Sequence, residues 1–188
     1  MDPSTAFGMT METDFELNHE DCVAGLRRLA VQSIDLVVTS PPYNLGIKYR
    51  KYSDVGDRNA YLDWCEEWAG QIQRVLKPSG SFFLNVGAAP SNPMLPHELV
   101  LRLRELFHLQ NTIHWIKAIT IPQSRDETGA SISRGHFKPI NSPRFLNDCH
   151  EYIFHFTPDG KTPIERLALG VPYADKSNIR RWSHTRGA

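Results

Sequence analysis

One short stretch, Ser40-Pro41-Pro42-Tyr43, combines residue types that together suit a planar ligand. Proline fixes the backbone angle φ and has no N–H donor, and the residue before a proline is pushed toward extended geometry. The two prolines therefore predict a rigid backbone whose carbonyls can accept hydrogen bonds, and the Ser40 hydroxyl adds another acceptor. Tyr43 offers a flat face for stacking. This combination indicates a site for a planar ring with an amino group, whereas the alternative is an ordinary turn.

The elements around this stretch predict where it lies in the fold. Apolar runs predict strands over residues 34–40, 81–87, 111–122 and 148–157. Helical spacing predicts helices over 60–77, which Asn59 can cap, and over 94–107. A long loop, either functional or disordered, is expected over 123–145. This alternation predicts an α/β fold with a parallel, doubly wound sheet, in which ligands bind outside the carboxyl ends of the strands. Ser40 stands at such an end.

Composition restricts the class of protein. The 188 residues have a formal net charge of zero, but residues 134–188 carry nine Lys or Arg against five Asp or Glu, which permits a polyanionic partner. The three cysteines have no paired spacing, so we expect neither disulfides, nor structural zinc, nor another metal site, and a reduced intracellular protein fits best. No apolar run is long enough to span a membrane. Residues 1–14 are interpreted as a flexible leader.

The stretch "TSPPYN", residues 39–44, resembles the catalytic motif of the S-adenosylmethionine-dependent amino-methyltransferases of nucleic acids, (D/N/S)-P-P-(Y/F). Serine in the first position is most typical of DNA cytosine-N4 enzymes, and Asp or Asn of adenine-N6 enzymes. The resemblance extends in order through "HEDCVAGLRRLAVQSIDLVVTSPPYN", "YLDWCEEWAGQIQRVLKPSGSFFLNVG", "IHWIKAITIP" and "NSPRFLNDCHEYIFHFT", over roughly residues 15–157. It implies a Rossmann-like doubly wound methyltransferase sheet.

The resemblance also implies roles for individual residues. Ser40 Oγ and the Pro41 carbonyl would accept hydrogen bonds from the target amino group, and Tyr43 would stack on a base flipped out of double-stranded DNA. Pro42 completes the motif, and Asn44 would support the turn or line the pocket. Asp21 matches the acidic residue that contacts the adenosine of the cofactor, S-adenosylmethionine; the alternative for Asp21 is a helix N-cap.

The motif order matches the permuted β class, in which the cofactor motif Phe-x-Gly-x-Gly comes downstream, and no such motif is present. We therefore interpret residues 15–157 as the catalytic half of the domain, and 158–188 as the start of a target-recognition segment. In the family's sheet, the strand that ends at Ser40 pairs with the missing strand, so it is expected to be an exposed edge. We expect a longer gene product, or association through that edge with a complementing chain or as a homodimer.

DNA contacts are predicted at a set of residues that are each also compatible with ordinary surface. Lys117 and Arg144 are expected to bind substrate, and a core aromatic is favoured for Trp115. The remaining basic and aromatic candidates are Arg125, Arg134, His136, Lys138, Arg180, Arg181, Trp182 and Arg186. His150 beside Glu151 could suggest a metal or a base, but strand-like alternation favours packing.

The preferred function is a site-specific DNA cytosine-N4 methyltransferase of the restriction-modification type, acting in a bacterial-type cytoplasm at the nucleoid. Adenine-N6 methylation is the alternative. A second alternative is a non-catalytic or split half, and a third is methylation of RNA or of a protein glutamine.

Overall fold

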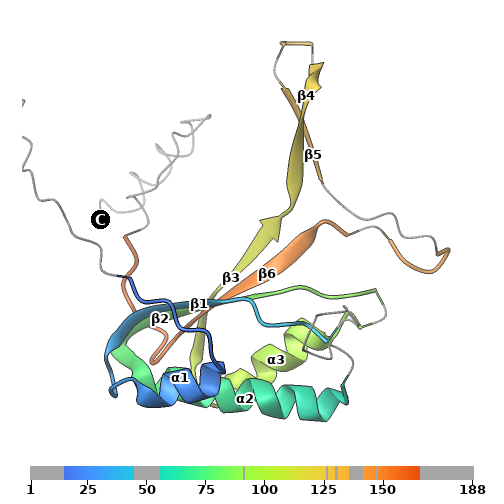
Figure 1. Cartoon of the computed structure of the whole chain (residues 1–188). Helices are drawn as coiled ribbons and strands as arrows, with labels where there is room; N and C mark the ends of the chain where they lie inside the picture. Colours follow the sequence, from blue (N-terminus) through green and yellow to red (C-terminus); the bar gives the residue numbers. More distant parts are fainter. Residues whose placement is uncertain are drawn as a thin grey trace, which may run out of the picture.

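The computed structural model describes residues 15–44, 56–90, 92–125, 127–129, 131–135, 142–146 and 148–165. The predicted leader and all but residues 158–165 of the predicted recognition segment lie outside these ranges. The chain is an α/β protein, as predicted, and Figure 1 shows its elements. They are α1 (Cys22–Arg28), β1 (Ile34–Thr39), α2 (Arg58–Val75), β2 (Leu76–Val86), α3 (Leu95–Leu103), β3 (His108–Ile116), β4 (Ala118–Arg125), β5 (Ser131–Gly135) and β6 (His150–Thr157).

The main sheet has the strand order β1-β2-β6-β3. β1 and β2 are parallel, but β6 is antiparallel to both β2 and β3, so the sheet is mixed, and the prediction of a parallel sheet is wrong for β6. Because β6 reverses between β2 and β3, β3 runs in the same direction as β1 and β2. The carboxyl ends of β1, β2 and β3 therefore share one edge of the sheet with the beginning of β6.

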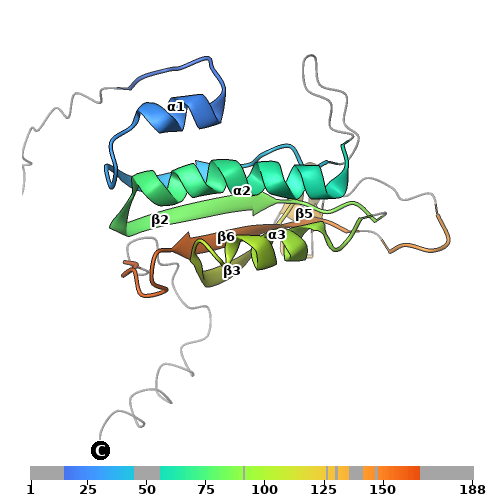
Figure 2. The same cartoon turned by 90° about the horizontal axis from the view of Figure 1, so that it is seen from below.

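The hydrophobic core lies between the sheet and the helices. Alternate residues of β2, namely Phe82, Leu84 and Val86, are buried. The ring of Phe82 packs edge-on against Trp68 of α2, with centroids 6.2 Å apart, and its centroid is 5.7 Å from that of Phe156 in β6. Burial of one apolar stripe against another is what holds an amphipathic helix on a sheet. Figures 1 and 2 show the three helices on the same side of the sheet.

The first strand of the sheet differs from the fully buried strand that its apolar run predicts. Leu36 is 55% exposed and Val38 is 69% exposed, while Val37 packs against the core. β1 is the outermost strand of the described sheet, beside β2 alone. Within the residues that the structure describes, the predicted exposed edge is therefore confirmed.

A β-hairpin replaces much of the predicted loop. β4 and β5 form a separate antiparallel sheet that pairs Ala118 with Gly135 and Ile121 with Ile132. Figure 1 shows this hairpin projecting away from the main sheet. The prediction of one strand over 111–122 is wrong, because β3 ends at Ile116 and the chain turns into the hairpin after Lys117. The loop predicted over 123–145 is wrong where it overlaps β4 and β5.

The long helix α2 begins earlier than its sequence pattern predicts. Its N-cap is Asp57, whose side chain accepts hydrogen bonds from the backbone N–H groups of Asn59 and Ala60 at 2.9 and 3.0 Å. The prediction that Asn59 caps the helix is wrong, since Asn59 lies inside the first turn. None of the helices in the described ranges is both long and apolar enough to cross a bilayer.

Candidate active site

Four strand ends bring their polar side chains together at one edge of the sheet. Thr39 pairs with Leu84, so Ser40 follows beside Asn85 near the end of β2. Asn85 in turn pairs with Ile153 of β6, and Glu151 of β6 pairs with Trp115 of β3. This register places polar groups from β1, β2, β3 and β6 around a single point, where parallel strands end and ligands are expected.

The predicted Ser40 and Tyr43 meet through their hydroxyl groups. Ser40 Oγ lies 2.7 Å from Tyr43 Oη, and either oxygen can be the donor. The Asn85 amide Nδ2 donates to Tyr43 Oη at 2.6 Å and approaches Ser40 Oγ at 3.3 Å. The side chain of Asn85 therefore binds both ends of the predicted catalytic stretch.

The rest of the stretch is fastened to helix α2. The Tyr61 hydroxyl donates to the Pro42 carbonyl at 2.8 Å. Asn44 has a φ of 54°, a left-handed conformation that asparagine tolerates, and its amide donates to Gly56 O at 3.2 Å and accepts from Gly56 N at 2.9 Å. Asn44 thus supports the turn, one of its two predicted roles. It also lines an open pocket with Gly56, Asp57, Ala60, Tyr61 and Trp64.

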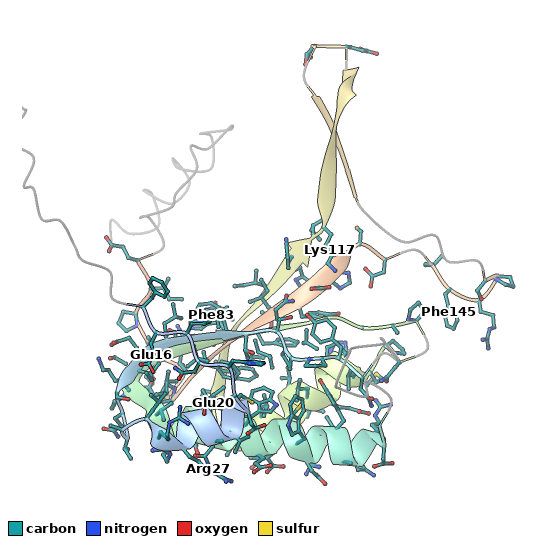
Figure 3. The ribbon with its side chains drawn as sticks, in the orientation of Figure 1. Glu16, Glu20, Arg27, Phe83, Lys117 and Phe145 are labelled. Carbon is teal, nitrogen blue, oxygen red and sulfur yellow. The ribbon has the colours of Figure 1, made fainter. Side chains whose placement is uncertain are left out.

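An ion pair adjoins the two hydroxyl groups. Lys117 Nζ pairs with Glu151 Oε1, and Glu151 Oε2 accepts a hydrogen bond from Asn85 Nδ2 at 2.8 Å. Glu151 is only 13% exposed and Lys117 is 39% exposed. Figure 3 shows Lys117 where β3 passes into the hairpin. We call the residues Ser40, Tyr43, Asn85, Lys117 and Glu151 the Ser40 cluster.

Burial changes the titration of the tyrosine in this cluster. Loss of water raises the pKa of Tyr43, and the negative charge of Glu151 acts in the same direction, while hydrogen bonds from Ser40 and Asn85 oppose the rise. Tyr43 is therefore a neutral phenol at neutral pH. A neutral phenol keeps a proton to donate, so it can both give and receive a hydrogen bond within the Ser40 cluster.

Two further predicted site residues make contacts outside the Ser40 cluster. Asp21 is the N-cap of α1, where its side chain accepts from Ala24 N at 3.0 Å, so the helix-cap alternative for Asp21 is confirmed. Its contact with a cofactor stays a prediction. The guanidinium of Arg144 lies 5.1 Å above the centre of the Phe145 ring, in a segment that Figure 3 shows apart from Lys117.

The other candidates have mixed outcomes. Trp115 is 49% exposed, so its interpretation as a core aromatic is wrong. His150 packs edge-on against Tyr152 with centroids 5.0 Å apart, which agrees with the packing interpretation, and its Nδ1 lies 2.6 Å from Asp148. The described residues contain no group of three potential metal ligands. Arg125 and Arg134 belong to the hairpin strands. His136, Lys138, Arg180, Arg181, Trp182 and Arg186 lie outside the described residues.

Sequence reasoning missed Asn85, and for His150 and Glu151 it favoured packing over a metal site or a base. Asn85 carried a usable signal: it is a polar residue near the carboxyl end of the apolar strand next to β1. Glu151 carried a weaker one, because its position near the start of β6 matters only once β6 is known to run antiparallel.

Comparison with known proteins agrees with this geometry. A family model described as DNA methylase, of the N6/N4 methyltransferase type, matches residues 34–187. The chain is 33% identical over 138 residues to the type II methyltransferase M.ScaI of Streptomyces caespitosus, covering 71% of this chain and 40% of that protein. It is 26% identical to the DNA adenine methyltransferase YhdJ of Escherichia coli, covering 88% of this chain and 52% of that one.

The fold agrees as well. The solved structure of the cytosine-N4-specific PvuII DNA methyltransferase matches with a TM-score of 0.54 and 20% identity, over 82% of this chain and 53% of that one. A putative DNA modification methylase from Thermus thermophilus matches with a TM-score of 0.52 and 26% identity, over 86% and 61%. The chain spans about half the length of the curated relatives it matches. It has a Rossmann-like methyltransferase fold, and it belongs to the N6/N4 DNA methylase family.

Proposed function

We propose that this chain takes part in the transfer of a methyl group from S-adenosylmethionine to the exocyclic N4 amino group of cytosine in double-stranded DNA. The observation that carries the proposal is the Ser40 hydroxyl at the carboxyl edge of the sheet, held by Tyr43 and Asn85. Family membership supports the reaction class. We propose that this activity takes place in the cytoplasm of a bacterial-type cell, at the nucleoid, where the DNA substrate is.

The side chains at this edge suit positioning of a weak amine nucleophile. Ser40 Oγ and the Pro41 carbonyl accept the two N–H bonds of the target amino group, which draws the nitrogen lone pair out of conjugation with the ring. The lone pair can then form the new N–C bond, and the extra proton on nitrogen leaves to water. Such a step depends on orientation and local charge, so no covalent enzyme intermediate is required.

S-adenosylmethionine supplies an electrophilic methyl group. Its sulfonium sulfur becomes a thioether when the methyl group is transferred. The residues present fit such a donor. Ser40 is exposed just past the end of β1, the outermost strand of the described sheet, so a methyl donor can reach it beyond the carboxyl ends of the strands. We propose Asp21 as the acceptor for hydroxyl groups of the adenosine. Its carboxylate has acceptor capacity beyond the one bond to Ala24.

Tyr43 and the basic residues serve the DNA in this proposal. A base must leave the stack to reach Ser40, and the ring of Tyr43 would then stack on it. Asn44 would line the base pocket, while Lys117 and Arg144 would bind substrate phosphates. For Lys117 this role competes with its ion pair to Glu151, which occupies the ammonium group.

Adenine-N6 methylation is the second candidate, because relatives of both types match this chain. Serine at position 40 favours cytosine by resemblance. A nucleoside digest of DNA incubated with the protein and S-adenosylmethionine decides between the two bases. We expect N4-methylcytosine, whereas a digest containing only N6-methyladenine overturns the cytosine assignment.

A split arrangement is the remaining candidate, and it rests on the outer edge of β1. β1, which carries the exposed apolar side chains Leu36 and Val38, pairs with β2 on one side only within the described sheet, and such a free edge is an association hazard unless another strand pairs with it. We propose that additional polypeptide, in a complementing chain or a second copy, pairs there. Sedimentation would test this proposal, and a well-behaved monomer that binds S-adenosylmethionine tightly by itself would contradict it.

A further inference from the structure

The carboxylate of Glu151 fixes the direction of the hydrogen bonds in the Ser40 cluster. An ionised carboxylate can only accept hydrogen bonds. Its Oε1 is occupied by Lys117, and its Oε2 accepts from Asn85 Nδ2 at 2.8 Å. The Asn85 amide must therefore turn its NH₂ group toward Glu151, because the opposite orientation would set two acceptors against each other.

This orientation leaves the Asn85 carbonyl without a partner. Asn85 Oδ1 is buried and makes no hydrogen bond among the described residues. An unmade hydrogen bond at a buried polar atom costs about 1–3 kcal/mol. The amide could satisfy Oδ1 only by turning away from the carboxylate, so the bond to Glu151 dominates the choice of orientation.

The two N–H protons of Asn85 then determine what Tyr43 does. The shorter contacts of Nδ2 go to Tyr43 Oη at 2.6 Å and to Glu151 at 2.8 Å, so Tyr43 Oη accepts one of the two protons. Tyr43 also lies close to Glu151, because a Cβ atom at Gly87 would be 3.1 Å from Tyr43 Cε2 and 3.3 Å from Glu151 Oε1. The negative charge of Glu151 favours the orientation in which the phenol proton points toward the carboxylate. With its own proton directed to Glu151, Tyr43 meets Ser40 as an acceptor.

Ser40 thereby keeps a lone pair for an incoming N–H group, because its remaining contact is the longer one to Asn85 Nδ2 at 3.3 Å. If the Ser40 hydroxyl donates to Tyr43 across their 2.7 Å contact, its proton points away from the edge of the sheet. A hydroxyl whose proton is already committed can offer only acceptor sites to an incoming N–H group. Without the carboxylate, the Tyr43 phenol can instead donate its proton to Ser40 Oγ. That hydrogen bond would occupy a lone pair of Ser40, and the Ser40 proton would then be free to point at the N–H groups of the target amine.

Glycine at position 87 leaves the space in which these groups meet. A Cβ atom there would lie 3.1 Å from Cε2 of Tyr43 and 3.3 Å from both Cγ and Oε1 of Glu151. Both neighbours would have to move by a few tenths of an ångström to admit it. The close approach of Tyr43 to Glu151 therefore depends on the absence of a side chain at Gly87.

We propose that Glu151, held by Lys117, is a positioning residue that keeps Ser40 Oγ a hydrogen-bond acceptor toward the target amino group. The inference rests on the proposed methyl transfer for its consequence, but the hydrogen-bond arrangement itself can be measured without any reaction.

The first test is a titration of Tyr43 in the full chain. NMR of ¹³Cζ-labelled tyrosine, with the signal assigned by Tyr43→Phe, follows the phenol in the wild type, in Glu151→Gln and in the control Asp148→Asn. We expect the pKa of Tyr43 to fall in Glu151→Gln, because the negative charge beside the phenol is removed, and to stay unchanged in Asp148→Asn. An unchanged Tyr43 pKa in Glu151→Gln overturns the proposal.

The second test is kinetic. Loss of an outer hydrogen-bonding partner typically costs about 10–100-fold in function at metal sites, and we expect a fall of that size in kcat for Glu151→Gln, with KM for DNA unchanged. Lys117→Met should lower kcat less, and Asp148→Asn not at all. Should Glu151→Gln fail to fold, Lys117→Met supplies the kcat readout alone, because the loss of Lys117 also removes a proposed phosphate contact and should raise KM for DNA; an unchanged kcat in Lys117→Met would then contradict positioning. A rise in KM without a fall in kcat would contradict positioning.

The two failures are distinguishable. If wild-type protein transfers no methyl group while Tyr43 titrates as expected, the proposed function fails and the hydrogen-bond arrangement stands. If the wild type is active and Glu151→Gln is equally active, the positioning role fails and the proposed function stands.

Discussion

The face of the sheet beneath the helices and the edge formed by the Ser40 cluster are built from the same strands with opposite chemistry. In β2, Phe82, Leu84 and Val86 are buried against the helices, while Asn85, between the last two, joins the polar edge. In β6, Phe154 and Phe156 pack into the core, whereas Glu151 accepts from Asn85. Alternation along a strand thus lets one element serve two purposes.

The difference in composition separates the hydrophobic core, which stabilises the fold, from the Ser40 cluster, to which we assign the chemistry. The core is aromatic and closely packed, and its free energy comes from apolar burial. The Ser40 cluster instead consists of polar side chains and an ion pair of which one member is substantially exposed. Exposed ion pairs contribute at most about 1 kcal/mol, so we attribute the arrangement of the cluster to function more than to stability.

The strongest test of this separation compares a core residue with an edge residue. Phe82→Ala removes a ring that is 0% exposed and packs against Trp68, Phe107 and Phe156, and we expect a loss of about 3–5 kcal/mol in the free energy of unfolding. Ser40→Ala, at an exposed position, should change stability by no more than about 0.5 kcal/mol. Urea unfolding of both variants measures the difference. Equal losses would break the comparison.

Helix caps give a smaller effect that sharpens the assignment of Asp21. Asp57→Ala should cost about 1 kcal/mol, because its side chain accepts from two N–H groups of α2. Asp21→Asn keeps a good N-cap for α1 and removes the charge, so stability should hold while S-adenosylmethionine affinity falls. Thermal unfolding and calorimetric titration check the two results, with Asp57→Asn as the matched control. Unaltered affinity in Asp21→Asn would argue against cofactor contact.

The smallest effect concerns His155, a buried histidine of β6. Its Nδ1 faces Asn111 Nδ2 and its Nε2 faces Ser81 Oγ, each at 3.0 Å, and its ring stacks on Phe83. Burial lowers the pKa of His155 below its ordinary value. A histidine with a lowered folded pKa contributes stability above the unfolded value, near 6.5, and that stability is lost as the pH falls.

The melting temperature of His155→Gln should therefore fall less than that of the wild type between about pH 7.5 and about pH 5.5. Carboxylates titrate in both proteins, so the difference between the two slopes isolates His155. Parallel pH profiles would mean that His155 does not need to stay neutral in the folded chain.

The sequence could predict those features that depend on neighbouring residues, namely several individual strands and helices and the Ser40–Tyr43 stretch. β1, α2, β2 and β6 follow from apolar periodicity, and Ser40 with Tyr43 follows from the residue types beside two prolines. The direction of β6 could not be predicted, because an apolar run looks the same whether its strand is parallel or antiparallel. Glu151 and Asn85 lie 66 positions apart, so their contact depends on that direction.

The sequence-based predictions of the hairpin and of the start of α2 were wrong for local reasons. Pro122 and Gly129, among polar residues, resemble a loop, yet β4 pairs with β5 on both sides of a register shift between Ile121 and Arg125. Asp57 and Asn59 are both good N-cap residues, and nothing in their spacing distinguishes them. The structure distinguishes them because the Asp57 carboxylate reaches two free N–H groups at once.

The most direct test of the central claim is the single-turnover rate of methyl transfer from labelled S-adenosylmethionine to DNA, measured for the wild type and Ser40→Ala. By analogy with the loss of one preorganised hydrogen-bonding group at an active site, we predict a fall of about 10²–10³-fold, with DNA affinity and melting temperature unchanged. Equal rates in the two proteins would contradict the claim that Ser40 positions the target amino group.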